Sequence, residues 1–288
     1  MNSKTRVMLL SCGSFNPITH MHLRIFELAR DFLNSTGRFH VVGGIMSPVN
    51  DGYKKKDLIS ATHRCKMVDL ALQSSDWIKL DSWESAQDDW TPTARVMEHH
   101  QTILNKITNS NNTSESVAKR QKLDVNNLNS INNNDFNNTW DLSQPVRIML
   151  LCGGDMLESF AVPDLWEQSD IEKIVGKHGL VVITRSGSNP ERFIYESDTL
   201  TTFRNNIHIV TEWIPNEISS THIRRALRRG CSVKYLIPDS VLKYIKEHEL
   251  FSSINKYHVS FHVNDSNYEY IKGLCDDMIL EPEQETAV

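Results

Sequence analysis

The chain has 288 residues, 31 of them Lys or Arg and 36 of them Asp or Glu, which gives a formal net charge of −5 with histidine neutral. This length provides for one or two domains with a buried core. The mildly acidic total excludes a protein whose whole surface binds nucleic acid, but it is compatible with a local basic pocket for phosphate. The five cysteines are widely spaced without a Cys-x-x-Cys pair, which argues against a disulfide framework and favours a reducing compartment. No apolar stretch approaches the roughly 18 residues of a membrane span.

Before residue 109, short apolar runs alternate with stretches whose apolar residues recur at helical spacing. Ser60 is suited to be the N-cap of the second helical stretch, and Pro92 to be the first residue of the third. The patterns predict strands at residues 6–12, 39–46 and 77–80, and helices at residues 20–35, 60–74 and 91–107.

From residue 109 to residue 138 the composition changes, because 11 of these 30 residues are Asn and no apolar periodicity is sustained. Such a polar tract buries too little apolar surface to offset the entropy lost on ordering it. We predict a disordered insert over about residues 109–143. Apolar runs then predict further strands at residues 146–152, 179–184 and 206–211.

Strands that alternate with helices predict an α/β protein with a Rossmann-like open parallel sheet and helices on both faces. Because the strands on either side of the insert complete one sheet, we predict a single domain over residues 1–253, interrupted by the insert. The acidic and weakly periodic residues 254–288 are predicted to form a C-terminal tail with a mobile end.

Residues 13–22, GSFNPITHMH, follow the first predicted strand, where open α/β sheets bind ligands. Gly13 allows the backbone to approach a ligand closely. His22 lies in the first turn of the next helix, where N–H groups and the helix dipole favour phosphate. Neither a Walker A loop nor a Gly-x-Gly-x-x-Gly pattern occurs in the chain, which disfavours a nicotinamide-dependent dehydrogenase.

Residues 218–224, ISSTHIR, form a second candidate phosphate site at a helix start. Ser220 and Thr221 offer hydroxyl and N–H groups, and Arg224 offers a planar guanidinium that suits phosphate oxygens. Two phosphate-binding helix starts at opposite ends of one chain are together a stronger indication than either alone.

Residues 19–22, THMH, resemble the (His/Thr)-x-Gly-His signature of a nucleotidyltransferase superfamily, with Met in place of Gly. This variant is similar to the animal nicotinamide mononucleotide adenylyltransferases, and residues 218–224 resemble the Ile-Ser-Ser-Thr-x-Ile-Arg motif of that family. The likeness extends over about residues 5–105 and 145–253.

The resemblance implies that ATP adenylylates nicotinamide mononucleotide, and also nicotinic acid mononucleotide, to form the dinucleotide (NAD from the former) and pyrophosphate. The implied step is a direct in-line attack without a covalent intermediate. A phosphate monoester has its second pKa near 6 and needs no general base at neutral pH. Mg²⁺ would be carried by the ATP phosphates. Because the motif lacks its glycine, the phosphate role is transferred to His22 and not to His20, and Arg224 is implied to grip the ATP phosphates.

The resemblance also implies a nucleotide pocket around His22 and Arg224. Trp90 and Trp166 match the family's aromatic contacts for the nicotinamide ring, and Thr93 is placed to bind the carboxamide. Asp155 is implied as a ribose acceptor, with a helix N-cap as the alternative interpretation, and the two roles are compatible. The other implied contacts are Gly13, Ser14, Phe15, Lys55, Gly153, Leu165, Arg185, Glu212, Asn216, Ser220, Thr221 and Ile223.

Two other functions stay open. One is a related transferase acting on pantetheine phosphate or on a cytidylyl acceptor, and the other is a chaperone-like interaction protein that uses the Asn-rich insert. The resemblance implies small-molecule nucleotide partners and a homo-oligomer, and we expect neither nucleic acid nor membrane as a partner. Residues 119–122, KRQK, favour a nuclear location, with the cytoplasm as the alternative. Because neighbours on a helix face different directions, we expect His99 and His100 at the surface rather than as a metal pair.

Overall fold

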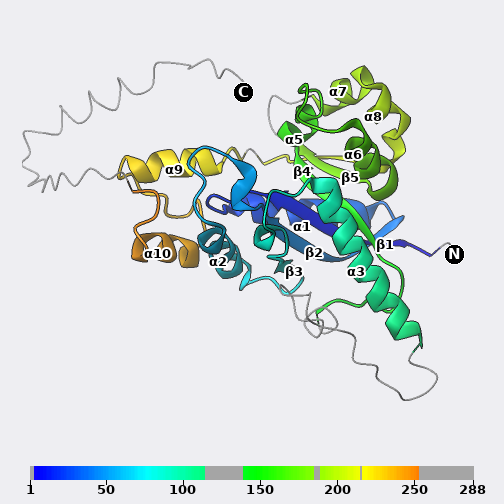
Figure 1. Cartoon of the computed structure of the whole chain (residues 1–288), viewed down its shortest axis with the longest axis horizontal. Coiled ribbons are helices and arrows are strands. Elements are labelled where there is room, and N and C mark those ends of the chain that lie inside the picture. Colours follow the sequence, from blue (N-terminus) through cyan, green and yellow to red (C-terminus); the bar gives the residue numbers. More distant parts are fainter. Residues whose placement is uncertain (1–2, 114–138, 185–188, 215, 253–288) are drawn as a thin grey trace, which may run out of the picture. The chain divides into compact units, whose positions relative to one another are not determined.

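The computed structural model describes residues 3–113, 139–184, 189–214 and 216–252. A parallel six-stranded sheet lies at its centre, in the order β3-β2-β1-β4-β5-β6 (Figure 1). Its strands are β1 (Thr5–Gly13), β2 (Phe39–Pro48), β3 (Ile78–Leu80), β4 (Arg147–Gly153), β5 (Leu180–Thr184) and β6 (Ile207–Thr211). The prediction of an open parallel sheet is confirmed, with every predicted strand end within two residues of the observed one.

Helices cover both faces of this sheet, as expected for parallel strands (Figure 1). Ser60 is the N-cap of α2, as predicted, because its side chain accepts a hydrogen bond from the Thr62 N–H at 3.2 Å. The α-helices are α1 (His20–Ser35), α2 (Ala61–Leu72), α3 (Thr93–Thr113), α5 (Gly154–Ser159), α6 (Gln168–Glu172), α7 (Pro190–Glu196), α8 (Asp198–Thr202), α9 (Ser220–Arg228) and α10 (Asp239–Glu247). A π-helix at Lys173–His178 and short 3-10 turns at Asp51–Tyr53, Glu84–Ala86 and Arg204–Asn206 complete the described elements.

The two faces of the sheet carry separate hydrophobic cores. In β1, Val7 and Leu9 belong to the core with α1, α2 and α10, whereas Met8 and Leu10 belong to the core with α3 and the π-helix. All four side chains are completely buried. The two-residue period of a strand places alternate residues on opposite faces, so an uninterrupted apolar run is the pattern of a strand buried on both sides.

The edges of the predicted insert lie elsewhere than expected. The helix α3 begins one residue after Pro92, whose carbonyl oxygen accepts the N–H of Val96, and it continues to Thr113 rather than ending at residue 107. On the other side, Trp140 is 4% exposed and donates its indole N–H to the Trp77 carbonyl oxygen at 2.9 Å. A Cβ at residue 43 would lie 2.5 Å from Trp140 Nε1, so the ring lies directly against Gly43. Residues 109–113 and 139–143 are therefore not part of a disordered insert, and disorder over residues 114–138, outside the described residues, stays a prediction.

The sheet order places a crevice at the carboxyl ends of its two central strands. β1 pairs with β2 on one side and with β4 on the other, and the chain continues in opposite directions from these two strands. Ligands of open α/β sheets bind at such a reversal of strand order. Gly13 ends β1 and Gly153 ends β4, so the two predicted glycines lie at this crevice.

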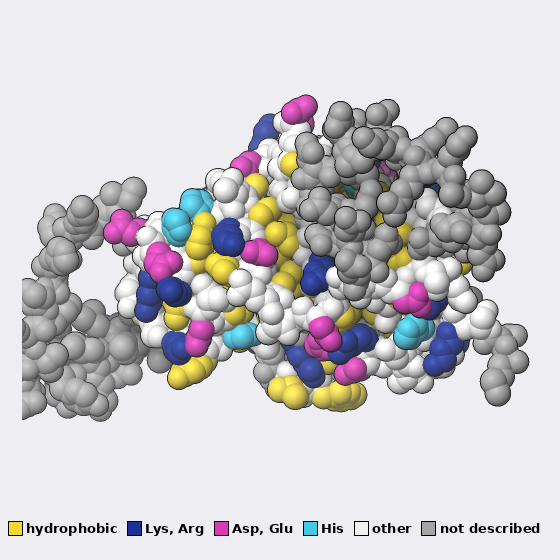
Figure 2. Space-filling view, turned by 90° about the horizontal axis from the view of Figure 1, so that it is seen from below, with side chains coloured by type: hydrophobic (Ala, Val, Ile, Leu, Met, Phe, Trp, Pro, Cys, Tyr) yellow, Lys and Arg dark blue, Asp and Glu magenta, His cyan; other side chains and the backbone are white. Residues whose placement is uncertain are grey.

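Charges on the surface are mixed in sign. On the face in Figure 2 basic and acidic side chains are interspersed, and exposed ion pairs such as Lys66–Asp69 and Arg192–Glu196 form within single helices. A net charge of −5 therefore says little about any one site. Within the described ranges, no helix has the length and the apolar character to cross a membrane.

Candidate functional site

A hollow of about 280 Å³ lies at the carboxyl ends of β1 and β4. It is lined from the loop after β1, from the starts of α1, α5 and α9, and from the segment before α2. The structure therefore brings together segments that are more than two hundred residues apart in the chain. The predicted site residues among its lining are Gly13, Ser14, Phe15, His22, Lys55, Gly153, Asp155, Ser220, Thr221 and Arg224.

The imidazole of His22 is fixed by the cap of its own helix. Thr19 is the N-cap of α1, and its backbone N–H donates to His22 Nδ1 at 3.0 Å. The Thr19 hydroxyl lies 2.8 Å from the same nitrogen. Because Nδ1 accepts the backbone hydrogen bond, the neutral ring carries its proton on Nε2. His22 is thus a donor at a helix start, the form that the phosphate role requires.

Phe15 connects Gly13 to His22. Its backbone is left-handed, with φ of 43°, and its ring folds back over the end of β1. A Cβ at residue 13 would lie 3.2 Å from Phe15 Cζ, so a larger residue than glycine would press against the ring. The Phe15 and His22 rings meet edge to face, with centroids 5.3 Å apart and planes at 77°.

The two phosphate motifs hold each other directly. Ser219 is the N-cap of α9 and accepts the His222 N–H at 3.2 Å. Ser220 Oγ donates to the Pro17 carbonyl oxygen at 2.8 Å, and Arg224 Nη1 donates to the Asn16 carbonyl oxygen at 2.8 Å. These two bonds orient the start of α9 toward the loop after β1.

The hollow concentrates positive charge. Burial lowers the pKa of Lys55, and the nearby charge of Arg224 lowers it further, against an opposing effect of Asp155. Burial also lowers the pKa of Arg224, a residue that is 7% exposed. Arg224 Nε is buried and has no hydrogen-bond partner in the described part of the chain. Two positive charges that repel each other in one hollow favour the binding of a polyanion.

The carboxylate of Asp155 reaches this hollow over Gly153. A Cβ at residue 153 would lie 2.5 Å from Asp155 Oδ1, which explains the glycine. The N-cap of α5 is Gly153, and Asp155 is an exposed residue in the first turn. The alternative interpretation of Asp155 as a helix N-cap is therefore wrong, whereas its role toward a ribose stays a prediction.

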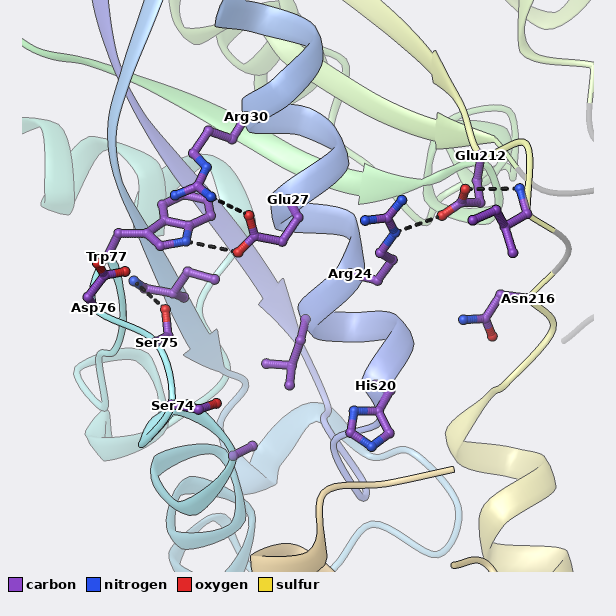
Figure 3. Close-up of a pocket in the computed structure, with 14 residues that line it drawn as sticks. His20, Arg24, Glu27, Arg30, Ser74, Ser75, Asp76, Trp77, Glu212 and Asn216 are labelled. Carbon is purple, nitrogen blue, oxygen red and sulfur yellow. Dashed lines mark hydrogen bonds and ion pairs between the residues drawn. The ribbon is translucent and has the colours of Figure 1, made fainter. Parts of the chain in front are cut away.

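Glu212 and Asn216 line a different pocket, of about 480 Å³, along the outer side of α1 (Figure 3). The Glu212 side chain is 6% exposed and accepts a hydrogen bond from Arg24 Nε at 3.1 Å. Its other oxygen accepts the Ile214 N–H, and Asn216 accepts the Ile218 N–H at 3.2 Å. In this structure both side chains accept backbone hydrogen bonds from the segment that leads into α9.

Other predicted residues lie outside the lining of the hollow. Trp166 packs edge to face on Phe160 and donates its indole N–H to Ser159 Oγ at 3.0 Å. Ile223 is 1% exposed and packs in the core, so its side chain does not line the hollow, and its contact with nucleotide stays a prediction. Arg185 lies outside the described residues. The remaining three are the exposed Trp90 and Leu165 and the partly exposed Thr93, whose contacts with nucleotide stay predictions.

Sequence reasoning missed a buried polar cluster behind the hollow. Ser47 Oγ donates to Glu84 Oε2 at 2.5 Å, and the Cys12 thiol also bonds to this carboxylate. Glu84 is 1% exposed, and burial raises its pKa to about 7. The available signal was Cys12 and Ser47, which stand near the ends of the apolar runs of β1 and β2.

The two adjacent histidines of α3 are less exposed than expected. His99 stacks on Trp83 with centroids 3.6 Å apart, and His100 is 1% exposed, so the prediction of a surface position is wrong for His100. The described residues contain no group of three or more His, Cys, Asp or Glu that could hold a metal ion.

Comparisons with known proteins identify the family. A family profile described as Cytidylyltransferase-like matches residues 10–226. Nicotinamide/nicotinic acid mononucleotide adenylyltransferase 1 of Bos taurus is 52% identical over 261 residues, covering 88% of this chain and 91% of that protein. The Arabidopsis thaliana nicotinamide/nicotinic acid mononucleotide adenylyltransferase is 41% identical, covering 87% of this chain and 92% of its own.

A solved structure has the same fold. Plasmodium falciparum nicotinic acid mononucleotide adenylyltransferase, complexed with NaAD, superposes with a TM-score of 0.55 over 86% of this chain and 97% of that one. Its sequence identity is 15%, so it supports the fold alone. Taken with the two close relatives, the motifs at residues 19–22 and 218–224 show that the chain belongs to the nicotinamide/nicotinic acid mononucleotide adenylyltransferase family.

Proposed function

We propose that the protein transfers the adenylyl group of ATP to nicotinamide mononucleotide, forming NAD and pyrophosphate, and that it also accepts nicotinic acid mononucleotide. The observation that carries this proposal is the meeting of two phosphate-binding helix starts, with His22, Lys55 and Arg224 lining one hollow. The names of the close relatives support the same reaction. They also disfavour a transferase acting on pantetheine phosphate or on a cytidylyl acceptor.

The residues of the hollow serve alignment and charge stabilisation. The mononucleotide phosphate is already mostly dianionic at neutral pH and attacks the α-phosphorus without a general base. His22 donates from Nε2 to the phosphoryl oxygens as charge develops there, and Arg224 and Lys55 hold the departing pyrophosphate. Because the imidazole is fixed by Thr19 before substrate binds, it needs no reorientation in the transition state.

Mg²⁺ enters this scheme with the substrate. Asp155 is the one carboxylate in the described lining of the hollow, so the chain offers too few oxygen ligands for a six-coordinate ion. The ATP phosphates would supply the other ligands. The ion would neutralise phosphate charge, while Asp155 is positioned for either the ion or a ribose hydroxyl.

Measuring NAD formation from nicotinamide mononucleotide, ATP and Mg²⁺ by the purified chain tests the proposal. The variant His22→Ala should lose roughly 10²–10³-fold in kcat, the usual cost of one transition-state donor. The matched control is His20→Ala, since the exposed His20 side chain lines the other pocket. A wild-type chain that forms no NAD would contradict the reaction, and a His22→Ala variant with wild-type kcat would contradict the role of His22.

We also propose a nuclear location and a homo-oligomeric state. The location rests on residues 119–122, which lie outside the described residues, with the cytoplasm as the alternative. Imaging of the tagged protein with Lys119, Arg120 and Lys122 changed to Ala tests the location, and an unchanged distribution would refute the signal.

Light scattering of the purified chain measures the oligomeric state, and a monomer mass of 33.1 kDa would contradict an oligomer.

A further inference from the structure

A second pocket lies at the opposite edge of the sheet, where β1 and β4 begin. We call it the basal pocket; its volume is about 540 Å³, within the range of small-molecule sites. Four of the side chains that line it are basic: Lys4, Arg6, Arg147 and Lys177. No Asp or Glu is among its lining in the described ranges. We propose that the basal pocket binds a small soluble molecule that carries a phosphate group.

The charges around the basal pocket are only half compensated. Arg6 pairs with Asp141 at 2.8 Å, and Lys177 with Glu98 at 3.6 Å. In each pair the acidic side chain is well exposed, 61% for Asp141 and 40% for Glu98, so solvent screens it. Neither Lys4 nor Arg147 has an acidic partner in the part of the chain that the structure describes. A bound dianion would supply the two missing negative charges.

Arg147 carries the strongest indication of an absent ligand. Its guanidinium is half-buried at the start of β4, and its Nε is buried without a hydrogen-bond partner among the described residues. Burial lowers the pKa of Arg147 without an opposing carboxylate. Arg147 Nη2 lies 3.2 Å from the place that a Cβ of residue 179 would take, so Gly179, with φ of 96°, leaves the room that the guanidinium occupies. A half-buried charge that no nearby carboxylate balances is costly, and an oxyanion would balance it.

The neighbouring groups suit a phosphate oxygen. His178 is 1% exposed, and its Nε2 is likewise buried without a partner in the described ranges. One wall of the pocket is rigid, because Gln101 donates to the Val146 carbonyl oxygen at 2.9 Å and accepts the Ile148 N–H at 2.8 Å. Arginine presents its N–H groups in a planar fork that matches phosphate oxygens. The volume exceeds that of a bare phosphate ion, which leaves space for an organic group.

The basal pocket is separate from the candidate catalytic hollow. β1 and β4 begin at the basal pocket and end at the catalytic hollow. Binding to the two must therefore be separated in the test. We suggest titrating the full chain calorimetrically with inorganic phosphate and with AMP at low ionic strength, in an Arg224→Gln background that weakens the catalytic hollow. In that background Arg147→Gln and Lys4→Gln should each weaken both probes about tenfold, the usual scale for one charge-assisted contact.

The matched control is Lys243→Gln, since the Lys243 side chain is 76% exposed on α10, away from the basal pocket. It should leave both affinities unchanged. Thermal melting checks the fold of Arg147→Gln; if this variant unfolds, Lys4→Gln decides the matter alone. The proposal is overturned if neither probe binds in the Arg224→Gln background, or if Lys4→Gln and Arg147→Gln leave both affinities unchanged. A parallel titration uses vesicles of phosphatidic acid. Binding to these vesicles but to neither soluble probe would also overturn the proposal.

Discussion

Arg224 Nη1 donates a buried hydrogen bond of 2.8 Å to the carbonyl oxygen of Asn16, a residue 208 positions earlier in the chain. With the neighbouring bond from Ser220 to Pro17, it makes the loop after β1 and the start of α9 one unit. Because Arg224 also lines the hollow, the proposed role toward phosphate and the observed bond to the loop belong to the same side chain. Its mutation should therefore affect stability and turnover together.

We predict that Arg224→Gln lowers the free energy of unfolding by about 1–3 kcal/mol, since the buried Asn16 carbonyl loses its charged donor. The same variant should lower kcat for NAD formation by roughly 10²-fold, the scale of one lost charge-stabilising donor. Denaturant unfolding and steady-state kinetics measure the two effects. The exposed Arg225 provides the control, and Arg225→Gln should change neither. A folded Arg224→Gln chain with normal turnover would exclude the catalytic role.

Gly13 gives a second prediction, through the contact of Phe15 with His22. In Gly13→Ala the new methyl group would lie 3.2 Å from the Phe15 ring, so the ring must shift and carry its contact with His22 along. A misplacement of about 1 Å at a reacting centre can cost roughly 10²-fold in rate; since a 3.2 Å contact requires a smaller shift of the ring, we expect kcat to fall by up to about tenfold. Adding Phe15→Leu should restore part of the loss by making room. Wild-type kcat in Gly13→Ala would show that this ring does not position His22.

Local patterns were enough to predict the sheet, because the central strands β1, β4 and β5 are apolar runs buried on both faces. The same holds for α1, whose bounds match the prediction. The helices α6, α7 and α8 were not predicted, since each is too short to show a helical period. The C-terminal α10 was also not predicted, although its buried Val241, Leu242 and Ile245 recur at helical spacing.

Long-range packing explains what the sequence could not reveal. Trp140 is buried because Gly43, almost a hundred residues earlier, leaves space for its indole, and no pattern near Trp140 contains that information. Likewise the motif at residues 218–224 does not reveal that Ile223 points into the core while Arg224 reaches the hollow. The residue types of the site and its helix starts could be predicted from the sequence. That Glu212 and Asn216 line one pocket while His22 and Arg224 line another depends on tertiary contacts.

The Arg24–Glu212 pair leads to a third prediction. Glu212 is almost fully buried and also accepts the Ile214 N–H, so the pair connects α1 to the segment before α9. A double-mutant cycle with Arg24→Gln and Glu212→Gln should give a coupling energy on the order of 1 kcal/mol in unfolding experiments. The exposed Arg192–Glu196 pair is the comparison, with an expected value below about 0.5 kcal/mol. Equal coupling in both pairs would show that burial of Glu212 adds nothing.

The ionisation of Glu84 makes the free energy of unfolding depend on pH. Burial raises its pKa to about 7 from the ordinary 4.5, while hydrogen bonds from Ser47 and Cys12 act in the opposite direction. Below pH 4.5 this carboxyl group is protonated in both the folded and the unfolded chain. Between about pH 4.5 and 7 the unfolded chain releases the proton and the folded chain keeps it, so the free energy of unfolding falls as pH rises. Above pH 7 the loss is complete, on the order of 3 kcal/mol.

We therefore predict that Glu84→Gln, which has no proton to lose, removes this decline. Its amide oxygen can still accept the Ser47 hydroxyl, so the cluster should keep its packing. Urea unfolding at several values from about pH 5 to pH 8 should show the free energy of the wild type falling relative to the variant by an amount on the order of 3 kcal/mol. Glu247→Gln, at a side chain that is 55% exposed, should follow the wild-type curve. Parallel curves for Glu84→Gln and the wild type would mean that Glu84 is ionised in the folded chain across this range, and that the cluster stabilises a charge rather than a proton.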